Sequence, residues 1–131
     1  MTGAITAEEF PAHWVNLVNA GDAAAVLALY DEGASLLPTF SPVPAVGHEE
    51  IGAYFAKLLS HEGVGVRLDE DSVGAAQTSD GLAVAYGTYA FFYRLDGELQ
   101  TFPARFTFVI DLSRSAPLLH HHSSLVPTPP A

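Results

Sequence analysis

The second half of the chain carries the feature that most limits its fold. From Gly65 onward, apolar and polar residues alternate with the two-residue period of β-strands. The dipeptide Asp96-Gly97 divides a long stretch of this pattern and is typical of a two-residue type I′ hairpin turn. We therefore expect residues 82–95 and 99–112 to pair as an antiparallel hairpin, followed by a last strand over residues 118–126.

Local signals at both ends predict the first helix. Thr6 and Glu9 have the spacing of a capping box, which places the start of the helix at about Ala7. Apolar residues then recur with helical spacing until Gly21, which supplies a left-handed stop. The apolar stripe includes Trp14, so we expect that side chain to face the core.

Two further helices are expected before the strands begin. Asp22 caps a shorter helix that turns Tyr30 inward and ends at Gly33. Residues 34–40 have the composition of a short strand, which is broken by a proline and followed by a proline-containing loop. A third helix begins at about His48 and has the cleanest amphipathic stripe in the chain.

The predicted helices precede most of the predicted strands along the chain. This order is typical of an α+β domain and argues against a doubly wound sheet. At 131 residues the chain is long enough for one domain with a single core, and it contains no internal repeat. We therefore expect residues 1–131 to form one domain, in which three N-terminal helices pack against a curved antiparallel sheet.

The hairpin turn also fixes which side chains share a face of the sheet. If Leu95 pairs with Glu98 across the turn, the rest of the register follows. Thr88 then lies opposite Arg105, and Tyr86 lies on the same face. The other face is lined by aromatic side chains: Tyr89, Phe91, Tyr93, Phe102, Phe106 and Phe108. Either face could be the one that the helices cover, and patterning alone leaves both arrangements open.

Neither face of this hairpin carries enough charge to be fully solvated, yet three short helices can cover only one of them. A second copy of the chain is the simplest cover for the other face. We therefore expect a homodimer packed sheet to sheet.

The charge balance narrows the classes of partner. A formal net charge of −10 repels phosphate backbones and anionic membrane surfaces, so neither nucleic acid nor a membrane is an expected partner. No apolar run approaches the roughly 20 residues of a membrane span, and no basic segment precedes an apolar stretch at the N-terminus. A cytoplasmic location is the resulting expectation.

The run His120-His121-His122 is the most conspicuous candidate for a metal site. Imidazoles two residues apart on a strand point the same way and could share a metal ion. A site needs at least three ligands, however, and the chain has no cysteine and no carboxylate beside the run. Because glycine-rich phosphate loops and dinucleotide motifs are also missing, we expect neither a metal nor an organic cofactor.

Three stretches of the sequence resemble a known family. They run from Asn19 to Asp22 and on to Pro38, from Pro103 to Val109, and from His120 to Pro127. Together they resemble the SnoaL-like proteins of the nuclear transport factor 2-like (NTF2-like) superfamily, related to the association domain of calcium/calmodulin-dependent protein kinase II and often labelled SgcJ/EcaC-type. The resemblance covers about residues 5–127. It implies a cystatin-like cone of curved sheet and helices, which encloses a pocket and dimerises through the sheet.

The resemblance also implies a set of pocket residues. The family positions for pocket arginines correspond to Arg105, Thr88 and Ser123, so only Arg105 keeps the basic side chain. The resemblance favours the face with Arg105, Thr88 and Tyr86 as the concave, ligand-binding face of the sheet. His121 has the same strand parity as Ser123 and is the histidine we assign as an acid–base group.

Trp14 and Tyr30 complete the predicted pocket, because a buried indole N–H and a buried phenol O–H both seek partners. The resulting prediction is a homodimeric protein that binds a small hydrophobic or carboxylate ligand between sheet and helices. One alternative is an isomerase, hydratase or cyclase acting on a hydrophobic metabolite through His121. Another is an oligomerisation module like the kinase association domain.

Overall fold

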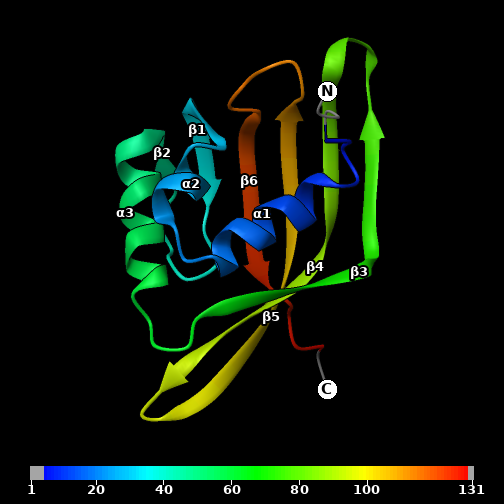
Figure 1. Cartoon of the computed structure of the whole chain (residues 1–131). Coiled ribbons are helices and arrows are strands. Elements are labelled where there is room, and N and C mark those ends of the chain that lie inside the picture. Colours follow the sequence, from blue (N-terminus) through cyan, green and yellow to red (C-terminus); the bar gives the residue numbers. More distant parts are fainter. Residues whose placement is uncertain (1–4, 130–131) are drawn as a thin grey trace.

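The computed structural model describes residues 5–129, so residues 1–4 and 130–131 of the predicted domain lie outside the description. The helices are α1 (Phe10–Asn19), α2 (Ala23–Leu27) and α3 (Gly47–Leu59), with one 3-10 turn at Ser79–Gly81. The strands are β1 (Tyr30–Leu37), β2 (Ala45–Val46), β3 (Gly65–Gln77), β4 (Leu82–Leu95), β5 (Glu98–Asp111) and β6 (Leu118–Leu125). They form one six-stranded sheet in the order β2-β1-β6-β5-β4-β3 (Figure 1). None of the described helices is long and apolar enough to cross a membrane.

The predicted hairpin register between β4 and β5 is confirmed. Leu95 pairs with Glu98 and Thr88 pairs with Arg105. Asp96 and Gly97 have φ angles of 53° and 82°, the two positive values that a type I′ turn requires. The register of the whole hairpin therefore follows from a two-residue turn.

The signals for the first two helix starts are also confirmed. The Glu9 amide donates to Thr6 Oγ1 at 3.2 Å, and the Thr6 amide donates to Glu9 Oε1 at 3.0 Å, which completes the capping box. Regular helix begins three residues later than expected, at Phe10, because the residues before it form a turn. Asp22 Oδ1 accepts from the Ala25 amide at 3.1 Å and so caps α2.

The boundary between α2 and β1 was predicted wrongly. The second helix ends at Leu27 instead of continuing to Gly33, and the strand begins at Tyr30. The reason is long-range pairing, because β1 lies parallel to β6 and the Leu118 amide donates to the Leu29 carbonyl at 2.9 Å. The sheet is therefore mixed, not purely antiparallel, and a periodic pattern within one segment does not reveal a partner so distant in sequence.

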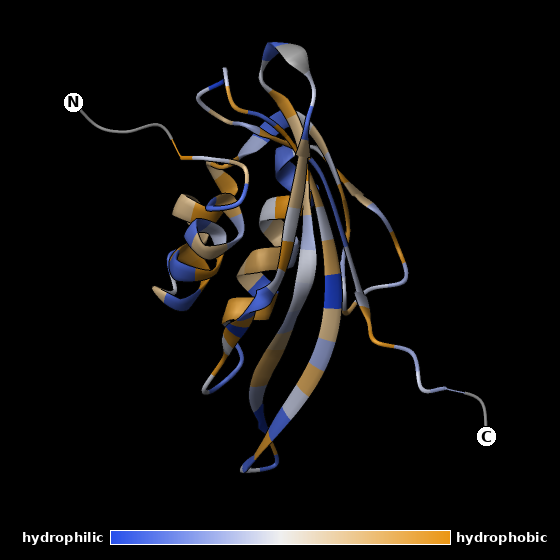
Figure 2. Ribbon diagram, turned by 90° about the vertical axis from the view of Figure 1, so that its right-hand side faces the viewer, coloured by the Kyte–Doolittle hydropathy of each residue, from blue (hydrophilic) through white to orange (hydrophobic). Residues whose placement is uncertain are grey.

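All three helices lie on one side of the sheet and leave the other face open (Figure 2). The covered face is the aromatic one, since Tyr89, Phe91 and Phe106 are at most 3% exposed. Arg105 is exposed and Tyr86 is 50% exposed, so the expectation that their face is the concave one is wrong. Covering several aromatic rings removes far more apolar area from water than covering a threonine and an arginine, which explains the choice of face.

Candidate functional site

A fully buried hydrogen-bonded group lies between the helices and the covered face of the sheet. Trp14 of α1 and Tyr30, the first residue of β1, are 0% exposed, and His121 of β6 is 1% exposed. Trp14 Nε1 donates to Tyr30 Oη at 3.1 Å, and Tyr30 Oη lies 2.8 Å from His121 Nδ1. The three residues are thus brought together from segments that are far apart in the sequence.

The same group continues on the other side of the imidazole. His121 Nε2 lies 3.0 Å from Tyr89 Oη on β4, and Tyr89 Oη donates to Ser123 Oγ at 2.6 Å. The Ser123 hydroxyl is in turn hydrogen-bonded to Thr39 in the loop after β1. We call this series the inner polar chain; its members are Trp14, Tyr30, His121, Tyr89, Ser123 and Thr39.

Counting protons gives the inner polar chain a direction. Tyr89 Oη donates its single proton to Ser123 Oγ, so it accepts from His121 Nε2–H. Nδ1 of the neutral imidazole is then an acceptor, and the Tyr30 hydroxyl, which itself accepts from the Trp14 indole, donates to it. The arrangement therefore selects one neutral tautomer of His121.

Burial keeps this group neutral. Desolvation, with a smaller contribution from His120 and His122, lowers the pKa of His121 well below its usual 6.5. Desolvation also raises the pKa values of Tyr30 and Tyr89 well above 10.0. Protonation of His121 would also place a proton on Nδ1 and leave the Tyr30 hydroxyl without its acceptor. The chain is therefore a set of neutral donors and acceptors near pH 7.

Two cavities adjoin the inner polar chain. A void of about 10 Å³, close to the space of one water molecule, is bounded by Trp14, His121 and Ser123 among others. A cleft of about 610 Å³ opens between the loop after β1, helix α3 and the end of β4. Tyr54 and Pro38 line both cavities, so they separate the inner void from the open cleft.

Aromatic and aliphatic side chains dominate the cleft. Its lining includes Phe40 and Tyr93, whose rings meet edge to face with centroids 5.7 Å apart, and Tyr54 on α3. Glu50 and Lys57, also on α3, add one charge of each sign. The lining thus combines a broad apolar wall with a few polar groups, the usual character of a ligand site.

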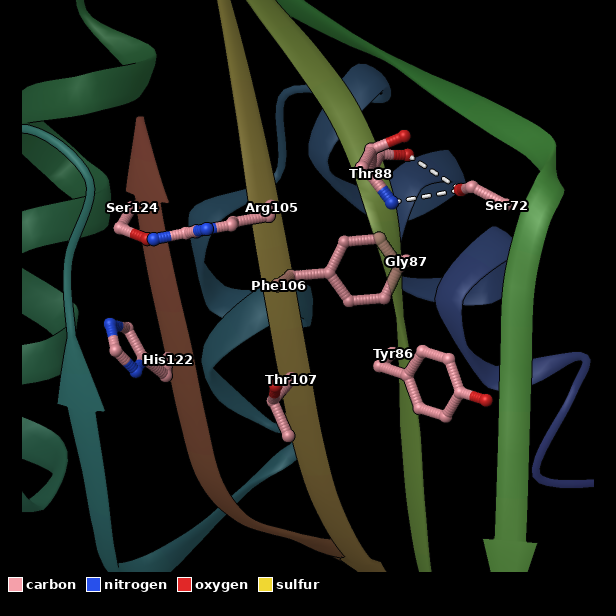
Figure 3. A pocket seen from close by; sticks show the side chains of 9 residues that line it. All are labelled: Ser72, Tyr86, Gly87, Thr88, Arg105, Phe106, Thr107, His122 and Ser124. Carbon is pink, nitrogen blue, oxygen red and sulfur yellow. Dashed lines mark hydrogen bonds between the residues drawn. The ribbon is translucent and has the colours of Figure 1, made fainter. Parts of the chain in front are cut away.

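Arg105, Thr88 and Tyr86 line a different hollow, of about 460 Å³, on the open face of the sheet (Figure 3). The Arg105 side chain extends along this face and donates from Nε to Ser124 Oγ at 3.4 Å. The Thr88 amide donates to Ser72 Oγ at 2.8 Å. The sheet lies between this hollow and the inner polar chain, so the predicted site residues form two groups on opposite faces.

The sequence prediction placed seven residues in one pocket, whereas in the structure Trp14, Tyr30, His121 and Ser123 lie together and Arg105, Thr88 and Tyr86 lie apart from them. It missed Tyr89, although a tyrosine on a strand face otherwise rich in phenylalanine signals a hydroxyl that needs a buried partner. Tyr54, a phenol on the apolar stripe of the third helix, carried the same signal but was not chosen, whereas Thr39 carried none. Their roles depend on how the loop after β1 lies against α3.

The other two histidines of the run lie away from this group. His120 and His122 pair with Val109 and Thr107 of β5, on the opposite face from His121. His120 Nδ1 lies 2.7 Å from Ser35 Oγ. Within residues 5–129, no three histidine, aspartate or glutamate side chains are grouped so that they could hold a metal ion.

Comparisons with known proteins give a match in structure. No model of a protein family matches the sequence, and no curated protein is significantly similar to it. A Xanthomonas campestris protein described as a calcium/calmodulin-dependent protein kinase II association domain is 27% identical, with a TM-score of 0.79 over 90% of this chain and 84% of that one. An NTF2-like protein with a cystatin-like fold from Novosphingobium aromaticivorans is 17% identical, with a TM-score of 0.72 over 91% and 79%.

A further match is SalBIII, an epoxide hydrolase/cyclase-like enzyme with a role in pyran ring formation in the polyether salinomycin. It is 14% identical, with a TM-score of 0.73 over 92% of this chain and 90% of that one. These neighbours confirm the α+β cystatin-like fold and the superfamily resemblance found in the sequence.

Proposed function

We propose that this chain, which has the fold of the NTF2-like superfamily, binds a small and largely apolar molecule in the cleft between the loop after β1, α3 and β4. The cleft itself carries the proposal. Its volume of about 610 Å³ lies within the usual range for small-molecule sites, and aromatic side chains line much of it. The inner polar chain behind Tyr54 gives the apolar cleft a hydrogen-bonded inner end.

The position of Arg105 changes the expected anchor for a carboxylate ligand. Arg105 is exposed on the far face of the sheet and cannot reach the cleft. Lys57 is the cation in the cleft lining, and Glu50, nearer the start of α3, is the anion. A hydrophobic ligand therefore fits better than a strongly anionic one, and a carboxylate ligand would depend on Lys57.

The homodimer remains part of the proposal. The open face of β4 presents Leu82, Val84 and Tyr86, which are 39%, 37% and 50% exposed. These side chains alternate along the strand and form an apolar strip, the kind of surface that a second copy covers. The likeness to a protein described as an association domain supports assembly of this kind, and makes an oligomerisation role compatible with ligand binding.

Direct catalysis by His121 receives less support. Both ring nitrogens are hydrogen-bonded to tyrosines and the residue is 1% exposed, so no nitrogen is left for a substrate. A void of about 10 Å³ beside the imidazole leaves room for no more than a water molecule. The inner polar chain is better suited to hold the site in shape than to exchange protons with a ligand.

The binding proposal is tested by filling the cleft. Small aromatic and aliphatic compounds are screened by amide chemical-shift mapping, and hits are expected to perturb residues around Phe40, Tyr54 and Tyr93. Ala53 lines the cleft, so Ala53→Trp should abolish binding, whereas Ala56→Trp is the matched control on an exposed position of the same helix. Binding that maps elsewhere, or that is unchanged in Ala53→Trp, would refute the proposal.

A further inference from the structure

The hydrogen bonds of the inner polar chain extend beyond Thr39 to a residue that lines the cleft. Burial raises the pKa of Tyr54 to about 12, while hydrogen bonds from the Phe40 amide and from the Thr39 side chain oppose that rise. The Phe40 amide lies 3.4 Å from Tyr54 Oη. Tyr54 is therefore a neutral phenol throughout the physiological pH range, and it follows Thr39 in the series.

Proton counting leaves one donor over at this end. A phenol oxygen can accept two hydrogen bonds and has one proton to donate. Thr39 receives the Ser123 proton and lies beside Tyr54, so either hydroxyl of the Thr39–Tyr54 pair can donate to the other and one proton of the pair is left over. The Phe40 amide also donates to Tyr54 Oη. When Thr39 donates to Tyr54, the remaining proton is that of Tyr54, which is the member of the pair that lines the cleft.

The free donor lies in the wall of the cleft. Tyr54 lines both the inner void and the open cleft, and Phe40 and Tyr93 stand beside it in the cleft lining. An unused hydroxyl proton in an apolar wall is costly unless a ligand or water accepts it. We propose that Tyr54 Oη donates to an acceptor oxygen of the ligand, such as a ketone, ester or ether oxygen on an otherwise apolar body. This inference rests on the proposed binding function.

The remaining polar groups of the cleft are less suited to this task. Glu50 already accepts from the Val46 amide at 2.8 Å, and a carboxylate has no proton to donate to an acceptor oxygen. The His61 ring is stacked on Tyr93, with centroids 4.2 Å apart and an interplanar angle of 11°. Lys57 would favour an anionic ligand. A neutral acceptor oxygen of the ligand therefore has the Tyr54 hydroxyl as its donor and does not depend on a charged group.

A matched pair of probes tests the inference. The ketone 2-acetylnaphthalene and the alkene 2-isopropenylnaphthalene have nearly the same shape, and only the ketone has an acceptor oxygen. Their dissociation constants are measured by chemical-shift titration on the full chain, on Tyr54→Phe and on Tyr86→Phe. Tyr86 lies on the open face of the sheet, so Tyr86→Phe removes a hydroxyl of the same kind outside the cleft.

The ketone should bind about 5-fold more tightly than the alkene to the wild type and to Tyr86→Phe, since a neutral hydrogen bond contributes a factor of this size. In Tyr54→Phe the ratio should fall to about 1 while the alkene affinity stays unchanged, which also shows that the cleft is intact. Equal binding of both probes to the wild type, or a ketone preference that survives in Tyr54→Phe, overturns the donor role and leaves the cleft as a binding site. If neither probe binds the wild type, the proposed binding function fails and the inference fails with it.

Discussion

Mild acid should destabilise this protein through His121. The imidazole is fully buried as a neutral group, and desolvation holds its pKa well below 6.5. In the unfolded chain the same side chain takes up a proton as the pH falls through about 6.5, so the unfolded state binds more protons than the folded state below that value. The stabilisation is therefore complete above about pH 6.5 and is lost as the pH falls toward the folded-state pKa.

The size of this effect follows from the difference in proton uptake. A histidine that stays neutral in the folded state down to pH 5 lowers the free energy of unfolding by about 2 kcal/mol between pH 7 and pH 5. Burial also lowers the pKa of His120, which adds a smaller loss of the same sign. Asp31 and Asp111 have pKa values lowered from 3.8, mainly by hydrogen bonds, so their contributions are lost only at lower pH.

Urea unfolding at pH 7, 6 and 5 measures the effect, with the fluorescence of Trp14, the single tryptophan, as the probe. Protein concentration is kept fixed because a dimer would make stability depend on it. His121→Gln can accept from Tyr30 and donate to Tyr89 but cannot be protonated, so most of the pH dependence should disappear. His120→Gln is the control and should retain most of the pH dependence. An equal dependence on pH in His121→Gln and in the wild type would refute the reasoning.

Three other expectations follow from the geometry. Tyr89→Phe removes the partner of both His121 and Ser123, so the free energy of unfolding should fall by about 1–3 kcal/mol in urea titration, and a change within error would contradict the inner polar chain. Tyr86→Glu places a charge on the open face and should convert the proposed dimer to a monomer in analytical ultracentrifugation, and a wild-type monomer would end the dimer proposal. Gly97→Ala should cost about 1 kcal/mol because its φ is +82°, whereas Gly33→Ala, where only an ordinary 3.6 Å contact is met, should change stability little in thermal unfolding.

Local signals were enough to predict much of the fold. The capping box at Thr6 and Glu9 and the turn at Asp96-Gly97 each depend on residues that are neighbours in the sequence, and both form as expected. The turn also predicted correctly that Thr88 pairs with Arg105. A short motif therefore fixed a register that extends over two long strands.

The parts of the sequence-based prediction that were wrong depend on contacts between distant segments. Period-two patterning separates two faces of a strand, but it cannot say which face the helices cover, and so Arg105 was placed on the wrong one. Tyr30 was predicted to lie in a helix but lies in β1, because β6 pairs with it. The inner polar chain combines residues of α1, β1, β4 and β6 with the loop after β1, so only the assembled fold brings its hydroxyls into hydrogen-bonding distance.

The place of β6 in the sheet has a consequence for how the chain acquires its structure during synthesis. Among the described strands β6 is made last, yet it lies between β1 and β5 and is the parallel partner of β1. Until residues 118–125 have left the ribosome, no strand joins β1 and β2 to the hairpin of β4 and β5 within the sheet. His121 and Ser123 arrive on that same strand, so the core and the polar groups beneath the cleft are completed together, only after β1 to β5 have been made.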